Sequence, residues 1–282
     1  MKRTLPWIVV AAAALVAAVV WYWWQRQEPP AAPPPVPRAE APAPAPEAPA
    51  VPPPQGQHPI EQAKPDAPPA AEPPPAMADS DKVIRDALVG QLGRDAVLSH
   101  LNVGDYVRRV VATVDNLPRK HAPARLWPVT PTADRMLAAE KGDAAFIDPA
   151  NARRYDAVVS MVAGADTGRL VALYVRLYPL FQQAYADLGH PNRHFNDRVV
   201  EVIDHLLAAP EVKGPVQVVR PEVKAPIPGE QGPPLWSYAD PQLEGLSAGH
   251  KIMVRVGPEH AAKLKAKLRD VRRQIAAAPV KG

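Results

Sequence analysis

The sequence predicts a mainly α-helical domain that follows a single transmembrane helix and a long linker. Three observations support this fold class. A continuous apolar run near the N-terminus is long enough to cross a membrane, 20 of the 38 prolines fall within residues 29–78, and the chain after residue 78 carries apolar residues at helical spacing. The 282 residues include no cysteine, which excludes disulfide bonds, thiolate catalysis and cysteine-ligated metals.

The first residues have the pattern of a membrane anchor. Residues 5–24 are apolar or aromatic, and a helix of that length spans roughly 30 Å. A cleaved signal peptide is the alternative, but residues 21–24 place large aromatic rings where a peptidase needs small side chains. Lys2 and Arg3 are expected to keep residues 1–4 in the cytoplasm. The protein is therefore expected at the inner (cytoplasmic) membrane, with its main domain in the periplasm.

A proline- and alanine-rich linker is expected between the anchor and the domain. Residues 25–78 have almost no large apolar side chains with which to offset the entropy of ordering, so they are predicted to be disordered. Proline favours polyproline II geometry there, and the segment is interpreted as a spacer. Residues 79–282 are expected to form one extracytoplasmic domain.

The first part of this domain predicts three short helices. Asp79-Ser80 is expected to cap the first helix, whose apolar residues are spaced for one buried face. A second helix covers Val97 to Leu101. A third helix is expected to be capped by Asp105 and to stop before Pro118, because proline disfavours helical geometry in the residue before it.

The middle of the domain predicts a hairpin and then longer helices. Residues 136–147, broken at Lys141-Gly142-Asp143, favour a small β-hairpin. Asp148-Pro149 and Asp240-Pro241 each combine a capping residue with a proline at the first helical position. Helices are expected over residues 150–163 and from Asp166-Thr167 to about Leu188, with a kink at Pro179.

The last part predicts two more helices and a strand. Asn196-Asp197 is expected to cap a helix that runs to about Ala208, and residues 216–219 favour a short edge strand. The final helix is expected to begin near Pro258 and to bury Leu264, Leu268, Val271 and Ile275. Its basic residues are expected to form a solvated face around that stripe: Lys263, Lys265, Lys267, Arg269, Arg272 and Arg273.

Several separated blocks of sequence carry a family resemblance. The longest is VALYVRLYPLFQQAYADLGHPNRHFNDRVVEVIDHLL at residues 171–207, joined by VRRVVATVDNLP at 107–118 and VRVGPEHAAKLKAKLR at 254–269. Together they resemble the bacterial family catalogued as domain of unknown function 3014, over a span from Asp79 to Ile275. The resemblance implies the same layout of anchor, proline-rich spacer and domain. It implies no activity and no catalytic residues.

Candidate site residues lie on two of the predicted helices. Glu201 and His205 are four residues apart and share a helix face with the spacing of a possible metal pair, but the pattern lacks the His-Glu-x-x-His spacing of a zinc site. Asp204 adds a second acid to this helix. Arg176 lies in an apolar stretch, so its guanidinium needs a partner, and Glu201 or Asp204 is the expected one.

The sequence does not fix a function. No catalytic residue, metal site or cofactor is assigned, because no phosphate-binding loop, nucleophile elbow or framed carboxylate pair is present. We expect a periplasmic binding, adaptor or tether module whose partner is an envelope protein or wall polymer. The alternative is an envelope enzyme that acts on a cell-wall polymer with an acidic site on the helix of residues 196–208. Nucleic acid is not an expected partner, given a net charge of only +4 and the expected location.

Overall fold

The structure is a computed structural model that describes residues 56–68, 72–132, 135–220 and 236–276. The predicted anchor at residues 5–24 lies outside the described residues. Within the described ranges, no single helix is long and apolar enough to cross a membrane. Pro149–Gly164 and Thr167–Asp187 meet that requirement only as a pair, with a bend of 77° between them.

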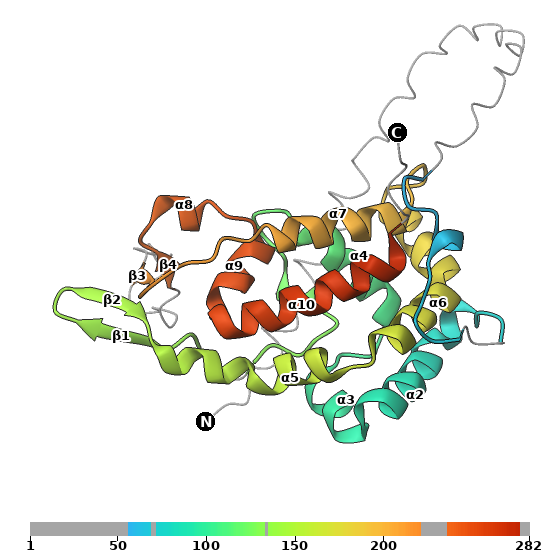
Figure 1. Cartoon of the computed structure of the whole chain (residues 1–282), viewed down its shortest axis with the longest axis horizontal. Coiled ribbons are helices and arrows are strands. Elements are labelled where there is room, and N and C mark those ends of the chain that lie inside the picture. Colours follow the sequence, from blue (N-terminus) through green and yellow to red (C-terminus); the bar gives the residue numbers. More distant parts are fainter. Residues whose placement is uncertain (1–55, 69–71, 133–134, 221–235, 277–282) are drawn as a thin grey trace, which may run out of the picture. The chain divides into compact units, whose positions relative to one another are not determined.

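Helices dominate the described part of the chain, as the sequence predicted (Figure 1). The α-helices are α2 (Ser80–Leu92), α3 (Arg94–His100), α4 (Tyr106–Asn116), α5 (Asp156–Gly164), α6 (Thr167–Asp187), α7 (Phe195–Leu207), α8 (Pro241–Glu244), α9 (Ala248–Arg255) and α10 (Pro258–Ile275). Four short 3₁₀ helices are η1 (Ile60–Gln62), η2 (Met77–Asp79), η3 (Ala124–Leu126) and η4 (Pro149–Tyr155). The helix expected over residues 150–163 is thus a 3₁₀ segment followed by an α-helix.

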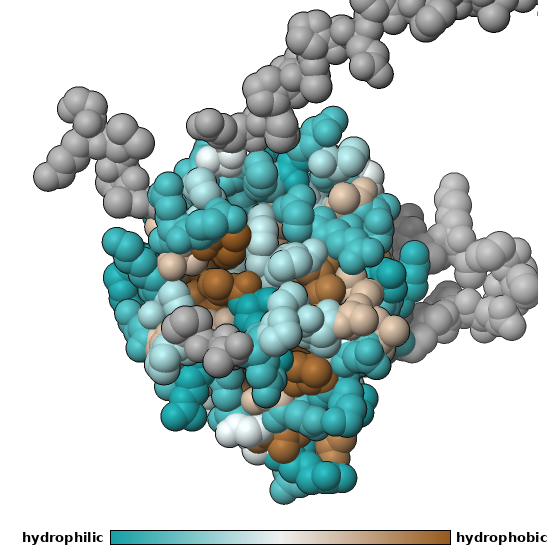
Figure 2. All heavy atoms as spheres, turned by 90° about the vertical axis from the view of Figure 1, so that its right-hand side faces the viewer, coloured by the Kyte–Doolittle hydropathy of each residue, from teal (hydrophilic) through white to brown (hydrophobic). Residues whose placement is uncertain are grey.

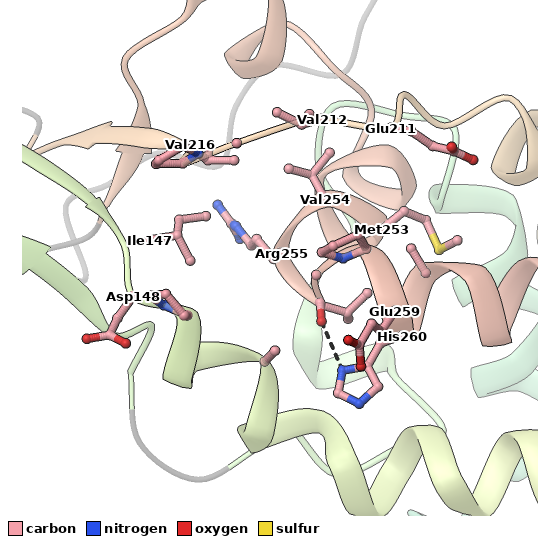
Figure 3. A pocket seen from close by; sticks show the side chains of 18 of the residues that line it. Ile147, Asp148, Glu211, Val212, Val216, Met253, Val254, Arg255, Glu259 and His260 are labelled. Atoms are coloured by element: carbon pink, nitrogen blue, oxygen red, sulfur yellow. Dashed lines mark hydrogen bonds between the residues drawn. The ribbon is translucent and has the colours of Figure 1, made fainter.

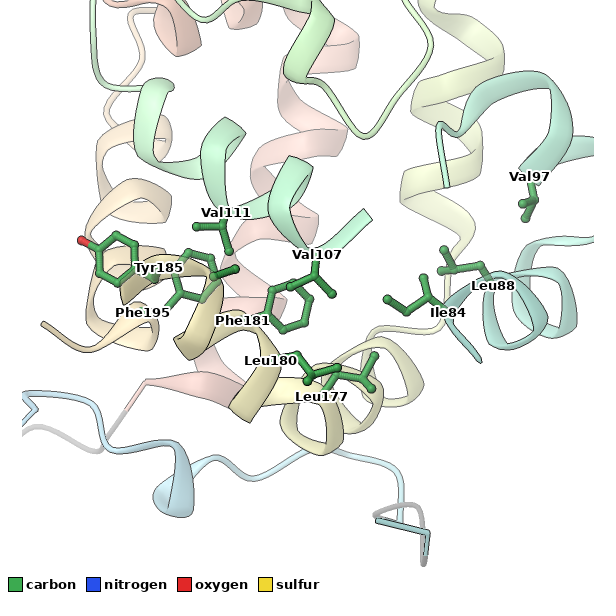
Figure 4. Packing of buried hydrophobic residues seen from close by; sticks show 11 residues of the cluster. Ile84, Leu88, Val97, Val107, Val111, Leu177, Leu180, Phe181, Tyr185 and Phe195 are labelled. Carbon is green, nitrogen blue, oxygen red and sulfur yellow. The ribbon is translucent and has the colours of Figure 1, made fainter. Parts of the chain in front are cut away.

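The largest core cluster joins α2, α4, α6 and the start of α7. Val107 and Val111 of α4 point toward the rings of Phe181 and Phe195, which stack with centroids 5.8 Å apart (Figure 4). Tyr185 of α6 is fully buried, and Phe181 is 6% exposed. This cluster fixes α6 against α4, because closely packed aromatic rings bury large areas and prefer specific geometries.

Helix α10 lies across the domain beside α7 (Figure 1). Ile275 is buried in a second cluster with Val171, Val200 and Ile203. Of the four residues that α10 was expected to bury, only Ile275 is fully covered, whereas the other three are partly buried. The predicted solvated face is also wrong at Lys265, which is 5% exposed.

A small antiparallel sheet lies at one end of the domain (Figure 1). Its strands are β1 (Ala138–Lys141), β2 (Ala144–Ile147), β3 (Gln217–Val219) and β4 (Ser237–Tyr238), in the order β1-β2-β3-β4. The predicted hairpin is confirmed as β1 and β2. The strand predicted at residues 216–219 is confirmed as β3, but its expected place at the edge of the sheet is wrong, because β3 pairs with β2 on one side and β4 on the other.

Three of the predicted caps are confirmed by hydrogen bonds. The carboxylates of Asp148, Asp166 and Asp240 accept bonds from backbone N–H groups in the first turns that follow them. Such bonds satisfy donors that have no partner within the helix. Pro179 lies inside α6.

Three other predicted caps are wrong. Asp79 and Asp105 occupy N-cap positions, but neither side chain makes a capping bond. Asp105 has φ 54°, and the Asp81 carboxylate instead accepts bonds from the backbone N–H groups of Asp105 and Tyr106, at 2.6 and 2.9 Å. Asn196 and Asp197 lie inside α7, whose N-cap residue is His194.

Part of the predicted linker lies on the domain surface. Residues 56–68, named here the strap, contact α6, α7 and α10 beside the C-terminal end of α10 (Figure 1). The strap contains η1 and donates backbone hydrogen bonds to side chains of α7 and α10. This segment of the predicted linker contacts the domain through hydrogen bonds and an ion pair, whereas residues 25–55 of that linker lie outside the described residues.

The outer face at this end of the domain is largely hydrophilic. Apolar side chains on it form separate groups between polar ones (Figure 2). Among the described residues, the exposed large apolar side chains are Leu98, Leu137, Leu188 and Val219, which are far apart in the sequence. Scattered apolar side chains of this kind are normal for a protein surface and do not indicate a docking patch.

Candidate functional site

The four residues singled out from the sequence do not form one site. Arg176 is 15% exposed, as its apolar surroundings predicted, but its partner is Glu72, at 2.8 Å, in place of Glu201 or Asp204. Glu72 precedes the domain in sequence, so this ion pair ties the end of the predicted linker to α6. Arg176 therefore does not orient α6 against α7 through an ion pair.

Glu201 and Asp204 of α7 are paired with arginines. Asp204 accepts two hydrogen bonds from Arg272, at 2.5 and 2.9 Å, and Glu201 lies 2.9 Å from the guanidinium of Arg198. His205 is instead bonded to Ser247 Oγ at 2.7 Å. These contacts stabilise helix packing and leave no open pair of carboxylates for acid–base chemistry.

His205 also stacks on His250, with ring centroids 4.0 Å apart and planes 7° from parallel. His250 Nε2 in turn contacts the backbone oxygen of His205, at 2.6 Å. Burial and the neighbouring His250 ring lower the pKa of His205, because both disfavour its charged form. The pair therefore joins α7 to α9 most firmly when His205 is neutral.

Asp115 is a buried charge centre that the sequence analysis missed. Its carboxylate is 5% exposed and pairs with Arg119, with Arg198 at 3.2 Å and with His190 at 3.8 Å. Asp115 follows Val107 and Val111 at intervals of four, so the helical spacing already placed it on the buried face of α4. A carboxylate on that buried face loses its hydration, so it requires neighbouring cations.

The described part of the chain contains a large pocket between the sheet and the helices α9 and α10. The end of β2 and the start of η4 form one wall, residues 210–216 form another, and the α9–α10 connection forms the third (Figure 3). The pocket volume is about 1030 Å³. That size is sufficient for a small organic ligand, and ligand sites are commonly this large and concave.

The lining of this pocket is mostly apolar. Its apolar residues include Phe146, Ile147, Val212, Val216, Met253 and Val254. Several acids also line it, but Glu211 is bonded to Lys265 at 3.1 Å and Asp156 to His260 at 2.9 Å. Asp148 caps η4. These carboxylates are therefore already balanced by cations or backbone donors.

Arg255 is a charged residue of the pocket with a buried donor that lacks a hydrogen-bond partner among the described residues. Its side chain extends from the end of α9 into the space between Ile147 and Val216 (Figure 3). The guanidinium carbon lies 5.6 Å from the ring centre of Tyr238. Its Nε is buried without a hydrogen-bond partner among the described residues. Burial of an unpaired donor is unfavourable, so a bound acceptor here is stabilising.

Lys265 and His260 are two buried residues that line the pocket and have partners within the fold. Lys265 Nζ donates to the backbone oxygen of Ala209, at 2.8 Å, just beyond the end of α7. A cation at a helix C-terminus is favoured by the exposed carbonyl groups. His260 is held by the backbone oxygen of Val256, at 3.0 Å (Figure 3). Both therefore have structural partners, which leaves Arg255 as the better candidate to meet a ligand.

Comparison with known proteins identifies the family. A family model described as "Protein of unknown function (DUF3014)" matches residues 106–272, more than half of the chain. The chain belongs to this family. The match takes in α4 and all the residues that line the pocket, including Arg255, whereas the strap precedes it. No curated protein and no solved structure matches this chain.

A metal centre finds no support in the described ranges. They contain no group of three or more histidine, aspartate or glutamate side chains arranged to hold a metal ion. The possible pair of Glu201 and His205 makes other contacts, with Arg198 and Ser247 respectively. Within this DUF3014 protein, the pocket is therefore the candidate functional site.

Proposed function

We propose that this DUF3014 protein is a binding module of the cell envelope whose pocket takes a small ligand with an apolar body and an anionic head. In this proposal residues 5–24 anchor it in the inner membrane, the helical domain lies in the periplasm, and the protein acts as an adaptor or tether. Anchoring raises the local concentration of membrane-associated partners around the domain, and this favours binding.

A single observation carries the ligand proposal: Arg255 lines a pocket of about 1030 Å³, and its Nε is buried without a hydrogen-bond partner among the described residues. The guanidinium prefers planar oxyanions, which it binds with two parallel hydrogen bonds. The surrounding apolar side chains favour a ligand whose remaining surface is hydrocarbon. Carboxylates and phosphates on an alkyl chain share this chemistry.

The acidic enzyme hypothesis has less support. Catalysis by two carboxylates requires both to face a common substrate position, but Asp204 is held by Arg272 and Glu201 by Arg198. Neither acid lines the pocket. Binding without chemistry therefore accounts for more of the described site than hydrolysis does.

Calorimetric titration of the full-length protein in nanodiscs tests the proposal. Octanoate and octyl phosphate are the anionic probes, and octylammonium is the probe of opposite charge. We expect saturable binding of the anions alone, and a loss of at least about tenfold in affinity in Arg255→Met, which keeps an apolar side chain but removes the fork of donors.

Arg85→Met is the matched control, since Arg85 is an exposed residue of α2 that does not line the pocket. In the same nanodiscs the probes partition into the lipid to the same extent, and Arg85→Met is expected to bind the anionic probes with the affinity of the wild type. Absence of saturable anion binding, or equal affinities in Arg255→Met and Arg85→Met, contradicts the proposal.

A further inference from the structure

The strap occupies a surface built from α6, α7 and α10. Its contacts with the domain fall at two points, one at residues 57–58 and the other at residues 64–67. Between these points the strap forms η1. Pro59 directly precedes η1, and Pro65 lies at the second contact point. The surface therefore holds a proline-containing segment of 13 residues at two points, with a 3₁₀ turn between them.

At the first contact point, side chains of α7 form hydrogen bonds with the strap backbone. Asp197 accepts bonds from the backbone N–H groups of Gln57 and His58, at 3.0 and 2.6 Å. Asn196, which is fully buried, donates from its Nδ2 to the backbone oxygen of His58 at 2.8 Å. Two side chains of α7 thus bind three backbone groups of the strap, which are the N–H groups of Gln57 and His58 and the carbonyl of His58. Residues other than proline can supply such groups.

The second contact point works in the same way. The backbone oxygen and the Oε1 of Gln274 accept bonds from the N–H groups of Lys64 and Asp66, at 2.7 and 3.0 Å. Arg273 adds an ion pair with Asp66, at 3.0 Å. Gln274 is 2% exposed, and its Nε2 has no hydrogen-bond partner among the described residues. The surface therefore retains a buried donor that the strap does not use.

Close approach of backbones marks this surface as shaped for a chain. A Cβ atom added at Gly168, in the first turn of α6, would lie 3.0 Å from the backbone of Asp66 and Ala67. One added at Gly56 would lie 3.0 Å from the His194 ring. Glycine at both positions lets the strap come nearer than a side chain allows.

We propose that this surface is a peptide-binding groove, which the strap occupies in cis and which an extended proline-containing segment of a partner protein occupies in trans. The partner supplies N–H donors at the positions of residues 57, 58, 64 and 66, an acid opposite Arg273, and a carbonyl for Gln274 Nε2. Recognition through the backbone tolerates many side chains. A partner segment can therefore replace the strap without a change in the groove.

A fluorescent peptide of residues 56–68 tests this groove on the full-length protein in nanodiscs by fluorescence anisotropy. In the wild type the tethered strap competes at a high effective concentration, so the peptide binds weakly. Gln57→Pro with Lys64→Pro removes two strap donors and leaves the groove unchanged. We expect this double variant to bind the peptide at least about tenfold more tightly than the wild type does.

Gly168→Ala, added to the double variant, is expected to weaken peptide binding because its Cβ would lie 3.0 Å from the backbone of the bound segment, closer than an ordinary contact. Gly90→Ala in the same background is the matched control, since a Cβ there meets nothing within 4 Å. It should leave binding unchanged. The proposal is overturned if the double variant binds no peptide, or if the Gly168→Ala and Gly90→Ala derivatives bind it equally. Neither result bears on the pocket of Arg255.

Discussion

Replacing Asp115 by asparagine removes the charge at the centre of the α4–α7 contact while keeping the shape of the side chain. The lost contact with Arg198, whose side chain is 12% exposed, costs about 2 kcal/mol, the range for a hydrogen bond to a charged group. The lost contact with Arg119, which is 57% exposed, adds at most about 1 kcal/mol. Arg198 keeps Glu201 and the backbone oxygen of Asp115 as partners, so the total is about 3 kcal/mol.

Urea unfolding followed by circular dichroism measures this loss, and heating should show a fall in Tm of about 6–12 °C for a domain of this size. The matched control is Asp86→Asn, which breaks an exposed pair with Lys82 on α2 and should change the free energy of unfolding by less than about 0.5 kcal/mol. If Asp115→Asn is as mild as this control, the buried charge centre does not stabilise the fold as we argue.

Two further predictions concern pH and a buried lysine. Because the pKa of His205 is lowered in the fold, the unfolded chain takes up a proton first as the pH falls below about 6.5, so stability should drop by at most about 1.4 kcal/mol per pH unit. Urea unfolding at pH 7.5 and 5.5 should show a smaller drop in His205→Gln, and an equal drop would refute the assignment. Lys265→Met should lower the free energy of unfolding by about 2 kcal/mol because the Ala209 oxygen loses its donor, whereas the exposed Lys263→Met should have almost no effect; similar values for the two variants would contradict this.

Local features of the fold were predictable from the sequence. The Asp-Pro pairs at 148–149 and 240–241 start helical segments because a carboxylate and a proline suit the first turn whatever lies around them. The bounds of α10 follow equally from Pro258 and the apolar spacing after it. The hairpin of β1 and β2 needs only its turn at residues 142–143. In each case the determining interactions lie within a few residues.

Features that depend on distant partners were not predictable. The strap has the composition of a disordered segment, and what holds it is a set of backbone bonds to α7 and α10, almost 140 residues or more away in sequence. Lys265 is buried because the end of α7 offers it a carbonyl. Arg255 has no local motif, and its place in the pocket arises only when the sheet and α9 come together. Single-sequence periodicity contains no information on such pairings.

Site-resolved binding at the pocket tests the central claim most directly. Met253 lines the pocket, whereas Met77 and Met161 do not, so methyl-¹³C-methionine NMR of the full-length protein provides a reporter with internal references. We predict that octanoate shifts the Met253 signal in a saturable manner, that the signals of Met77 and Met161 stay in place, and that Arg255→Met suppresses the shift of the Met253 signal. A Met253 signal that does not move, or that moves equally in Arg255→Met, would contradict an anion-binding pocket.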